Sequence, residues 1–350
     1  MLLYALVVSV AVSAPQDSKQ ITLNRVFAKN ERLVYSVDSN IHVEERQYPL
    51  QTFIPAEVEL SYKFTTDVRD LKNDGVAVVH YQRPSVVQVD GETFERPPKT
   101  TIEKLDWNFD LTVSPINEIL EKKDLNPPKK KKPTQGGGDG SGDTSYLISR
   151  VLVARQNPIQ TVLGQFVGEV YRLALNVGSM DSALDFSPKL PADDVKVGDS
   201  WKKTVSYQPQ KLKDQNGKQA VQRLDYTFTY KGLVTVEGKQ FYRVTAALNL
   251  STDLGAFINQ MLEAKPDQTH LKSIPLTLKQ SIDYDLDLTT KRTVQARSQS
   301  EGGFNIEVTD MDGPVVENKL KGSTLMKLVS IGTTPPVKPP VKHGGGHGRE

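Results

Sequence analysis

Apolar and polar residues alternate most regularly along residues 223–250, RLDYTFTYKGLVTVEGKQFYRVTAALNL. On both sides of the turn at Glu237-Gly238, one parity is mostly apolar and the other mostly polar. The apolar positions are Leu224, Tyr226, Phe228 and Tyr230 before the turn, and Tyr242, Val244, Ala246, Leu248 and Leu250 after it. A period of two on both sides of a glycine turn predicts an antiparallel hairpin with one buried face.

Weaker alternation of the same kind recurs along most of the chain. It predicts strands near residues 31–46, 56–89, 107–113, 276–289, 292–309 and 325–331. The Asn73-Asp74-Gly75 sequence between two of these runs is typical of a hairpin turn. The fold class expected from this pattern is mainly β (α+β), with curved antiparallel sheets and a few packed helices, half-barrel-like in shape.

Three places carry helical signals instead. The clearest is an apolar stripe with helical spacing behind the cap candidates Ser251, Thr252 and Asp253, formed by Leu254, Phe257, Ile258, Met261 and Leu262. A pair of helices is expected from Ser145 onward, and Ser114-Pro115 is typical of a helix start. These helices are expected to cover one side of the sheets.

Three segments of the first half resemble segments of the second half in the same order. Residues 59–65 match 223–229, residues 106–112 match 283–289, and residues 31–37 match 199–205. Each match alone is ordinary strand sequence, but three in one order favour an internal duplication. Two related β units are therefore expected.

Changes in composition along the chain predict where the two β units begin and end. Residues 126–144 are rich in proline, lysine and glycine and are expected to be a linker between a first β unit at 21–125 and a second at 145–332, which includes the helical pair. Residues 333–350 have the composition of a disordered Pro/Gly-rich tail. Residues 1–14 are interpreted as a signal peptide, because Leu2–Val12 is apolar but too short to span a bilayer. A buried first strand is the alternative.

Charge and cysteine usage narrow the function classes. The 350 residues carry a formal net charge of +2, so no strong overall field attracts nucleic acid or an anionic membrane. Basic charge is concentrated only at Lys129–Lys132. The absence of cysteine excludes disulfides, thiolate metal sites and thiol nucleophiles. No stretch after the first is long and apolar enough for a transmembrane helix.

The residues Leu190-Pro191, Val195, Gly198-Asp199 and Trp201 form the pattern LPxxxVxxGDxW. This pattern resembles one in a family of exported bacterial proteins of unknown function. That family looks like long curved antiparallel sheets with helices on one side, a plan similar to the lipoprotein carriers of the bacterial envelope. The resemblance implies export to the periplasm or the outside of a bacterium and a fold style, but no activity.

Few residues suggest chemistry. Asp283, Asp285 and Asp287 share one face of a predicted strand and are candidate Ca²⁺ ligands, but one straight strand cannot supply the roughly six to eight converging oxygens that Ca²⁺ takes. Cross-strand pairing with basic residues such as Arg297 is the favoured interpretation. Asp193, Asp194 and Asp199 form an acidic turn that would need a cleft to act as acid and base. No metal, cofactor or catalytic residue is expected, and the protein is not expected to be an enzyme.

The leading hypothesis is an exported, non-catalytic protein that binds a lipid-like or other apolar ligand between the sheet and the helix. The candidate ligand-binding residues are Tyr226, Phe228, Tyr230, Tyr242, Phe257, Ile258, Met261 and Leu262. The same residues can equally form a closed core. The alternative function is a scaffold or interaction module of the cell envelope with an envelope protein as partner and no small-molecule ligand.

Overall fold

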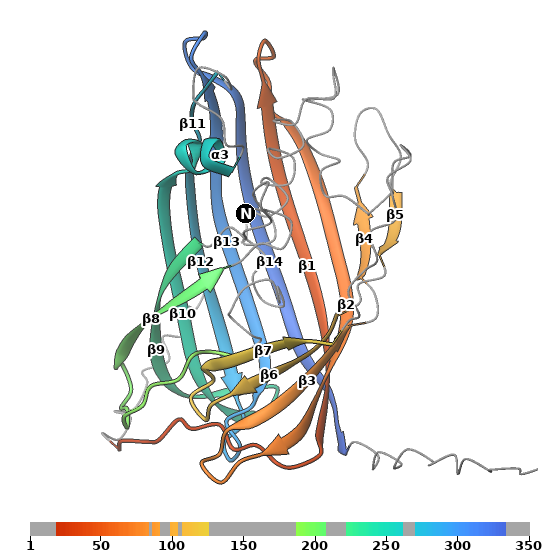
Figure 1. Ribbon diagram of the computed structural model, residues 1–350, viewed down its shortest axis with the longest axis vertical. Coiled ribbons are helices and arrows are strands. Elements are labelled where there is room, and N and C mark those ends of the chain that lie inside the picture. The colour runs from red at the N-terminus through yellow and green to blue at the C-terminus, as the bar shows by residue number, and fades with distance from the viewer. Residues whose placement is uncertain are drawn as a thin grey trace, which may run out of the picture.

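A computed structural model describes residues 19–83, 86–91, 99–103, 107–125, 187–207, 222–261 and 270–333 (Figure 1). The described chain is mainly β, as the alternation predicts. The expected signal peptide at 1–14, linker at 126–144, helical pair after Ser145 and tail from residue 334 lie outside the described residues.

The strands of the first half are β1 (Glu31–Gln47), β2 (Ile54–Leu71), β3 (Ala77–Arg83), β4 (Val86–Asp90), β5 (Lys99–Glu103), β6 (Trp107–Val113) and β7 (Ile119–Asp124). Those of the second half are β8 (Ser200–Tyr207), β9 (Gln222–Val236), β10 (Lys239–Asp253), β11 (Leu271–Ser273), β12 (Pro275–Leu286), β13 (Thr293–Val308) and β14 (Pro314–Thr333). The predicted hairpin at 223–250 is β9 and β10, paired antiparallel across the turn at Glu237 and Gly238.

All of these strands belong to one antiparallel sheet rather than to two separate units. Its order is β7-β6-β3-β2-β1-β14-β13-β12-β10-β9-β8, with β4, β5 and β11 paired at the side. The first strand and the last strand join the two halves, with β1 and β14 in register from Glu31 opposite Thr333 to Gln47 opposite Val316. The expectation of two sheets is corrected by this long pairing, whose partners are almost 300 residues apart and leave no local signal.

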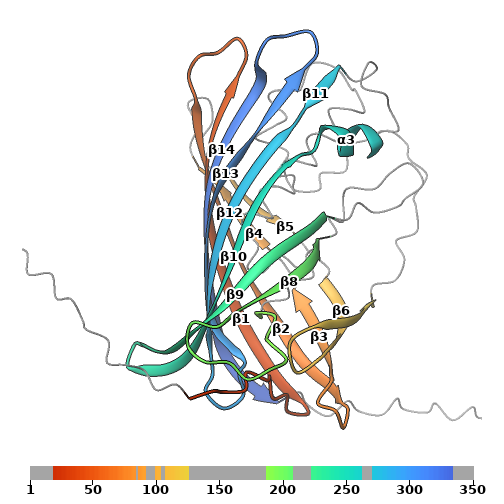
Figure 2. The same ribbon diagram turned by 90° about the vertical axis from the view of Figure 1, so that its left-hand side faces the viewer.

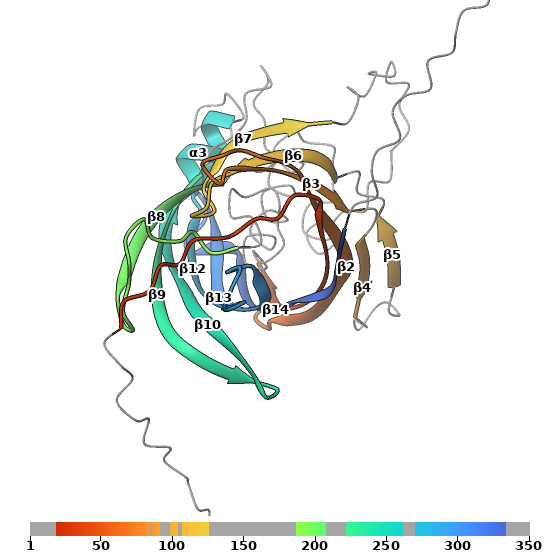
Figure 3. The same ribbon diagram turned by 90° about the horizontal axis from the view of Figure 1, so that it is seen from below.

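Two names are used below for the ends of the sheet (Figure 1). The lower end holds Glu31 and the β12–β13 turn, and the upper end holds the β1–β2 and β13–β14 turns. The sheet is strongly curved, and its strands wrap around a common interior (Figures 2 and 3). We call the side turned to this interior the inner face. The expected half-barrel-like curvature agrees with these views.

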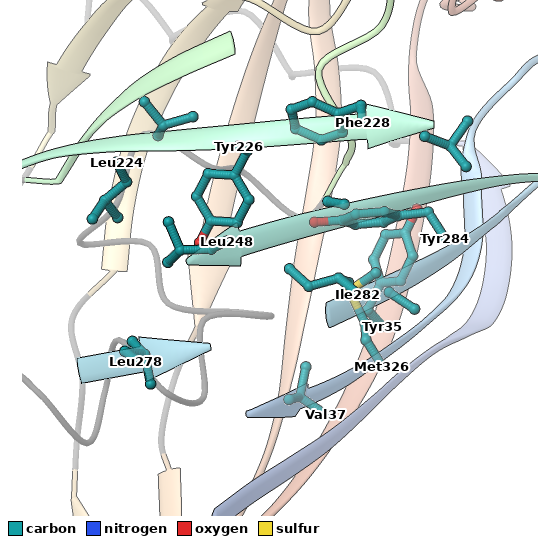
Figure 4. Close-up of a cluster of buried hydrophobic side chains, with 14 of the residues drawn as sticks. Tyr35, Val37, Leu224, Tyr226, Phe228, Leu248, Leu278, Ile282, Tyr284 and Met326 are labelled. Carbon is teal, nitrogen blue, oxygen red and sulfur yellow. The ribbon is translucent and has the colours of Figure 1, made fainter. Parts of the chain in front are cut away.

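Alternation decides which residues occupy the inner face. In β1 the odd positions are buried from Leu33 to Val43, in β10 the even positions are buried from Val244 to Leu248, and in β12 the even positions are buried. The apolar residues among them join a single cluster that extends over both halves of the sheet. Figure 4 shows part of it, with Leu224, Tyr226, Phe228, Leu248, Tyr284 and Met326 gathered from β9, β10, β12 and β14.

Among the described residues the helix content is smaller than expected. One α-helix, α3 (Gly255–Met261), follows Asp253, whose Oδ1 accepts hydrogen bonds from the backbone N–H of Gly255 (2.7 Å) and of Ile274 (2.9 Å). The predicted helix is therefore present, and Asp253 bonds to its first N–H, but Leu254 occupies the N-cap position, since its carbonyl accepts from the Ile258 N–H (2.9 Å). The helix start expected at Ser114-Pro115 is wrong: these residues begin a turn that leads into β7, and the Ser114 Oγ accepts from the N–H of Glu118 (3.1 Å).

The three matched segments occupy corresponding places in the two halves. They fall in the first, second and fourth strands of each half along the main path, namely β1 with β8, β2 with β9, and β6 with β12. In the sheet itself the places differ, since β1 lies in the middle and β8 at an edge. The duplication itself stays a prediction.

Candidate functional site

The predicted ligand-binding residues of β9 lie on the inner face. Tyr226 and Phe228 have no exposed surface, and Tyr230 is 3% exposed. Tyr242 on β10 is half-buried, and Ile258 of α3 is fully buried. Only the backbone is described for Phe257 and Met261, and Leu262 lies outside the described residues. Burial of this parity of β9 and of Ile258 agrees with the alternation and with the helical stripe.

Aromatic rings continue from residue to residue along this part of the face. The Trp201 ring stacks on Phe228 with centroids 5.9 Å apart, and Tyr226 lies 6.1 Å from Phe228. Tyr230 meets Tyr242 edge to face at 6.0 Å. Burial, with a smaller contribution from Tyr242, raises the pKa of the Tyr230 phenol to about 12, so this hydroxyl is neutral at physiological pH.

A band of polar side chains crosses the inner face between the apolar regions. We call it the polar band; its members are Ser39, Gln280, Ser298, Ser300 and Thr324, all less than 9% exposed. The Tyr226 hydroxyl donates to Gln280 Oε1 (2.8 Å), and Gln280 Nε2 donates to Ser298 Oγ (3.2 Å). Thr324 Oγ1 donates to Ser39 Oγ (3.0 Å).

The registers explain why these residues meet. Ser298 lies opposite both Ile282 of β12 and Thr324 of β14, and Thr324 lies opposite Ser39 of β1. The sequence analysis missed the band because each polar residue is an isolated exception within its own strand. Its signal is a polar residue at an inward parity, as at Gln280 between Leu278 and Ile282.

The N-terminal segment, residues 19–30, crosses the lower end of the sheet and is called the strap here (Figure 3). Ile21 pairs with Val195, the Arg25 N–H donates to the Pro115 carbonyl (2.7 Å), and the Val26 N–H donates to the Thr290 carbonyl (2.8 Å). Leu23, between these contacts, is fully buried. The strap therefore joins turns from both halves of the sheet.

The LPxxxVxxGDxW residues build the second part of this closure. Leu190 is fully buried and its N–H donates to the Ile116 carbonyl (2.9 Å) of the β6–β7 turn. The Trp201 Nε1–H donates to the Lys189 carbonyl (2.8 Å). Gly198 has a φ of +95°, which favours glycine, and its N–H donates to the Tyr230 carbonyl (2.9 Å). The motif thus connects the segment before β8 to the β6–β7 turn in the other half of the sheet.

A buried ionic cluster fixes the strap to the sheet. Glu31 accepts hydrogen bonds from Arg25 (2.5 Å) and from Arg292 (2.7 Å), and Glu31 and Arg25 are both less than 9% exposed. In the same β12–β13 turn, burial alone would raise the pKa of Asp287, but hydrogen bonds from Thr290 and Thr289 and the charge of Arg292 lower it. The turn therefore keeps its carboxylate ionised.

Asp283 and Asp285, two of the three aspartates considered as metal ligands, pair with arginines, whereas Asp287 lies beyond the end of β12 and bonds to Thr289 and Thr290. Asp285 is 1% exposed and accepts from Arg243 (2.8 Å) and from Arg297 (3.3 Å) on the neighbouring strands. The bond to Asp285 outweighs burial and raises the pKa of Arg243. Within the described ranges no group of three or more His, Asp or Glu side chains could hold a metal ion. Cross-strand pairing is therefore the arrangement at this face.

The acidic turn lies next to the strap. Asp193 and Asp194 are exposed, and Asp194 accepts a hydrogen bond from the Thr22 hydroxyl. Asp199 is half-buried and accepts from the Lys196 N–H (3.0 Å), which closes the turn before β8. In this structure two of the three carboxylates therefore make contacts that shape the lower end.

Comparisons with known proteins give little beyond this geometry. No family model and no curated protein matches the chain. Among solved structures, one described by the words lipid–protein interactions in lipovitellin aligns with 89% of this chain at 8% identity and a TM-score of 0.41. This chain spans 26% of that one. Pseudomonas aeruginosa OccK7 (OpdD) aligns with 87% of this chain and 99% of its own at 10% identity and a TM-score of 0.28. Neither likeness carries an argument about function. In the described part of the chain, no helix has the length and apolarity needed to cross a membrane.

Proposed function

We propose that this chain is a non-catalytic binding protein whose inner face holds a lipid-like ligand. The observation that carries the proposal is the inner face itself, a single apolar surface that continues over both halves of the curved sheet and is crossed by one polar band. An apolar chain gains free energy against such a surface in proportion to the area it buries, at about 25 cal/mol per Å².

The polar band narrows the ligand class to an amphiphile. Hydroxyl and amide groups at Gln280, Ser298 and Thr324 can exchange their mutual hydrogen bonds for bonds to an ester, hydroxyl or carboxyl group. A pure hydrocarbon can only leave these groups bonded to one another, whereas the polar group of an amphiphile can bond to them while its apolar part contacts the rest of the face. A fatty acid or an acylglycerol fits both parts of the face.

We also propose that the protein acts after export from a bacterial cell. This rests on the apolar run Leu2–Val12 and on the family resemblance of the residues between Leu190 and Trp201. N-terminal sequencing of the protein recovered from its host tests the point. A chain that starts near residue 14 supports export, and a chain that retains Met1 contradicts it.

The ligand is tested by native mass spectrometry and organic extraction of the full chain purified from its host. The expected result is one class of amphiphile bound at a defined stoichiometry.

Ala246 and Ala247 provide a matched pair of positions for substitution, because Ala246 is buried on the inner face and Ala247 is exposed on the outer face.

Ala246→Phe is expected to reduce binding of a fluorescent fatty acid roughly tenfold or more, since the ring occupies space on the face. Ala247→Phe should leave binding unchanged. Circular dichroism checks that both variants keep their strand content. Equal binding by both variants, or extracts free of lipid from every preparation, would contradict the proposal.

A further inference from the structure

The turn between β1 and β2 presents apolar side chains to solvent at the upper end. Residues 47–55, QYPLQTFIP, contain no charged residue, although a quarter of the whole chain is charged. Tyr48 is 64% exposed, Leu50 is 53% exposed and Ile54 is 44% exposed. We call residues 47–55 the hairpin tip. An exposed apolar cluster of this kind at one end of a molecule is typical of an interaction site.

The hairpin tip is held in place by a bond to β14 and by a bond within the turn. The Tyr48 N–H donates to the Val315 carbonyl (3.0 Å) and the Leu50 N–H donates to the Gln47 carbonyl (2.7 Å). The Phe53 ring contacts two cations, with Arg46 4.8 Å and Lys319 3.9 Å from its ring centre. Because Phe53 is anchored in this way, the exposed side chains beside it are presented on a supported turn.

The chemistry of these side chains suits the boundary between lipid headgroups and acyl chains. A tyrosine has an apolar ring and a polar hydroxyl, and leucine and isoleucine next to it can enter the apolar layer. Arg46 and Lys319 lie at the base of the tip, at the level where phosphate groups would lie. The tip and its base therefore supply basic, aromatic and aliphatic groups, the three kinds that contact the phosphate, interfacial and acyl layers of a bilayer surface.

The neighbouring turn decides which kind of lipid surface fits. The β13–β14 turn at the same end contains Asp310 and Asp312, and both are exposed. Next to the basic groups lie Glu44 and Glu317, of which Glu317 pairs with Arg46. With acidic and basic groups side by side, an anionic surface is not favoured and a zwitterionic one is tolerated.

We propose that the hairpin tip inserts into a zwitterionic phospholipid surface, so that the upper end of the sheet faces the membrane. The contact is reversible and shallow, because three side chains insert. It goes beyond ligand binding on the inner face, and either activity can fail without the other.

The test uses the full chain and phosphatidylcholine vesicles in a sedimentation assay. The triple variant Tyr48→Ser, Leu50→Ser, Ile54→Ser is expected to reduce the bound fraction at limiting lipid roughly 30-fold or more, since each side chain contributes several-fold through apolar burial. A matched control, Val26→Ser, Leu233→Ser, Ile331→Ser, removes side chains of similar exposure (56%, 43% and 56%) from the lower end and should bind like the parent.

Insertion is checked directly with Leu50→Trp and Leu233→Trp. Brominated phosphatidylcholine should quench the added tryptophan of Leu50→Trp and leave that of Leu233→Trp unchanged. Light scattering of the vesicle-free protein tests whether a second copy covers the tip instead. Three outcomes would each overturn the proposal. The two triple variants could sediment equally with vesicles, or the two added tryptophans could be quenched equally. The parent could also be a dimer that dissociates only when the tip is changed.

Discussion

The two ends of this sheet are stabilised in different ways. At the lower end, backbone hydrogen bonds, the buried Arg25–Glu31–Arg292 cluster and the packed Leu190 and Trp201 join the two halves. At the upper end, ion pairs such as Arg46–Glu317 are partly exposed and the hairpin tip presents apolar groups. The difference indicates that the lower end maintains the curvature and the upper end is available for interaction.

The largest expected effect comes from removing the buried carboxylate. Glu31→Gln leaves Arg25 and Arg292 without their counter-charge in a buried place, and the free energy of unfolding should fall by about 3–5 kcal/mol. Urea denaturation monitored by circular dichroism measures this. The control is Glu317→Gln at the upper end, where Arg46 is one-third exposed, and the expected loss is at most about 1 kcal/mol. Similar losses for both variants would remove the contrast between the ends.

A smaller effect is expected at the seam before β8. Trp201→Phe keeps a ring to stack on Phe228 but removes the donor to the Lys189 carbonyl, which leaves that carbonyl without this bond. The expected loss in unfolding free energy is about 1–2 kcal/mol. Compared with the parent protein, the Trp201→Phe variant should exchange its amide hydrogens faster in β8 and at an unchanged rate in β2. Unchanged exchange in β8 would show that the indole bond does not hold the seam.

The smallest expected effects concern pH and have opposite signs at the two ends. Asp287 at the lower end has a pKa below its ordinary value of 3.8, so its contribution is present above pH 3.8 and is lost as the pH falls through the lowered value. His42 near the upper end has a pKa above its ordinary 6.5, mainly through its bond to Glu57. Its contribution is present below pH 6.5 and is lost as the pH rises through the raised value.

Thermal unfolding from pH 2 to pH 9 separates the two groups. Asp287→Asn should flatten the acid limb of the stability curve and leave the limb above pH 6.5 unchanged. His42→Gln should flatten the limb above pH 6.5, by a small amount because the histidine and Glu57 are both over one-third exposed. If either variant alters the opposite limb, other groups determine the pH dependence at that end.

The candidate site was predictable as far as alternation reaches. Tyr226, Phe228 and Tyr230 were assigned to a buried face because a period of two specifies one side of a strand. The spacing behind Asp253 likewise located α3. The polar band was not predictable in this way, because Gln280 and Ser298 meet only through the register of β12 against β13. The helix expected at Ser114-Pro115 failed because contacts with the strap and with residues 188–190 stabilise a turn there.

The sequence by itself determined the antiparallel β class, the buried parity of β9 and β10, and the location of α3, since each depends on residues within a few positions of one another. Only the tertiary structure decided that one sheet replaces two, that the strap and the LPxxxVxxGDxW residues close the lower end, and that polar residues line up across four strands. These features depend on pairings between distant segments, above all β1 with β14. These features are stabilised by contacts between residues far apart in the sequence, and the local periodicity of a strand does not predict such contacts.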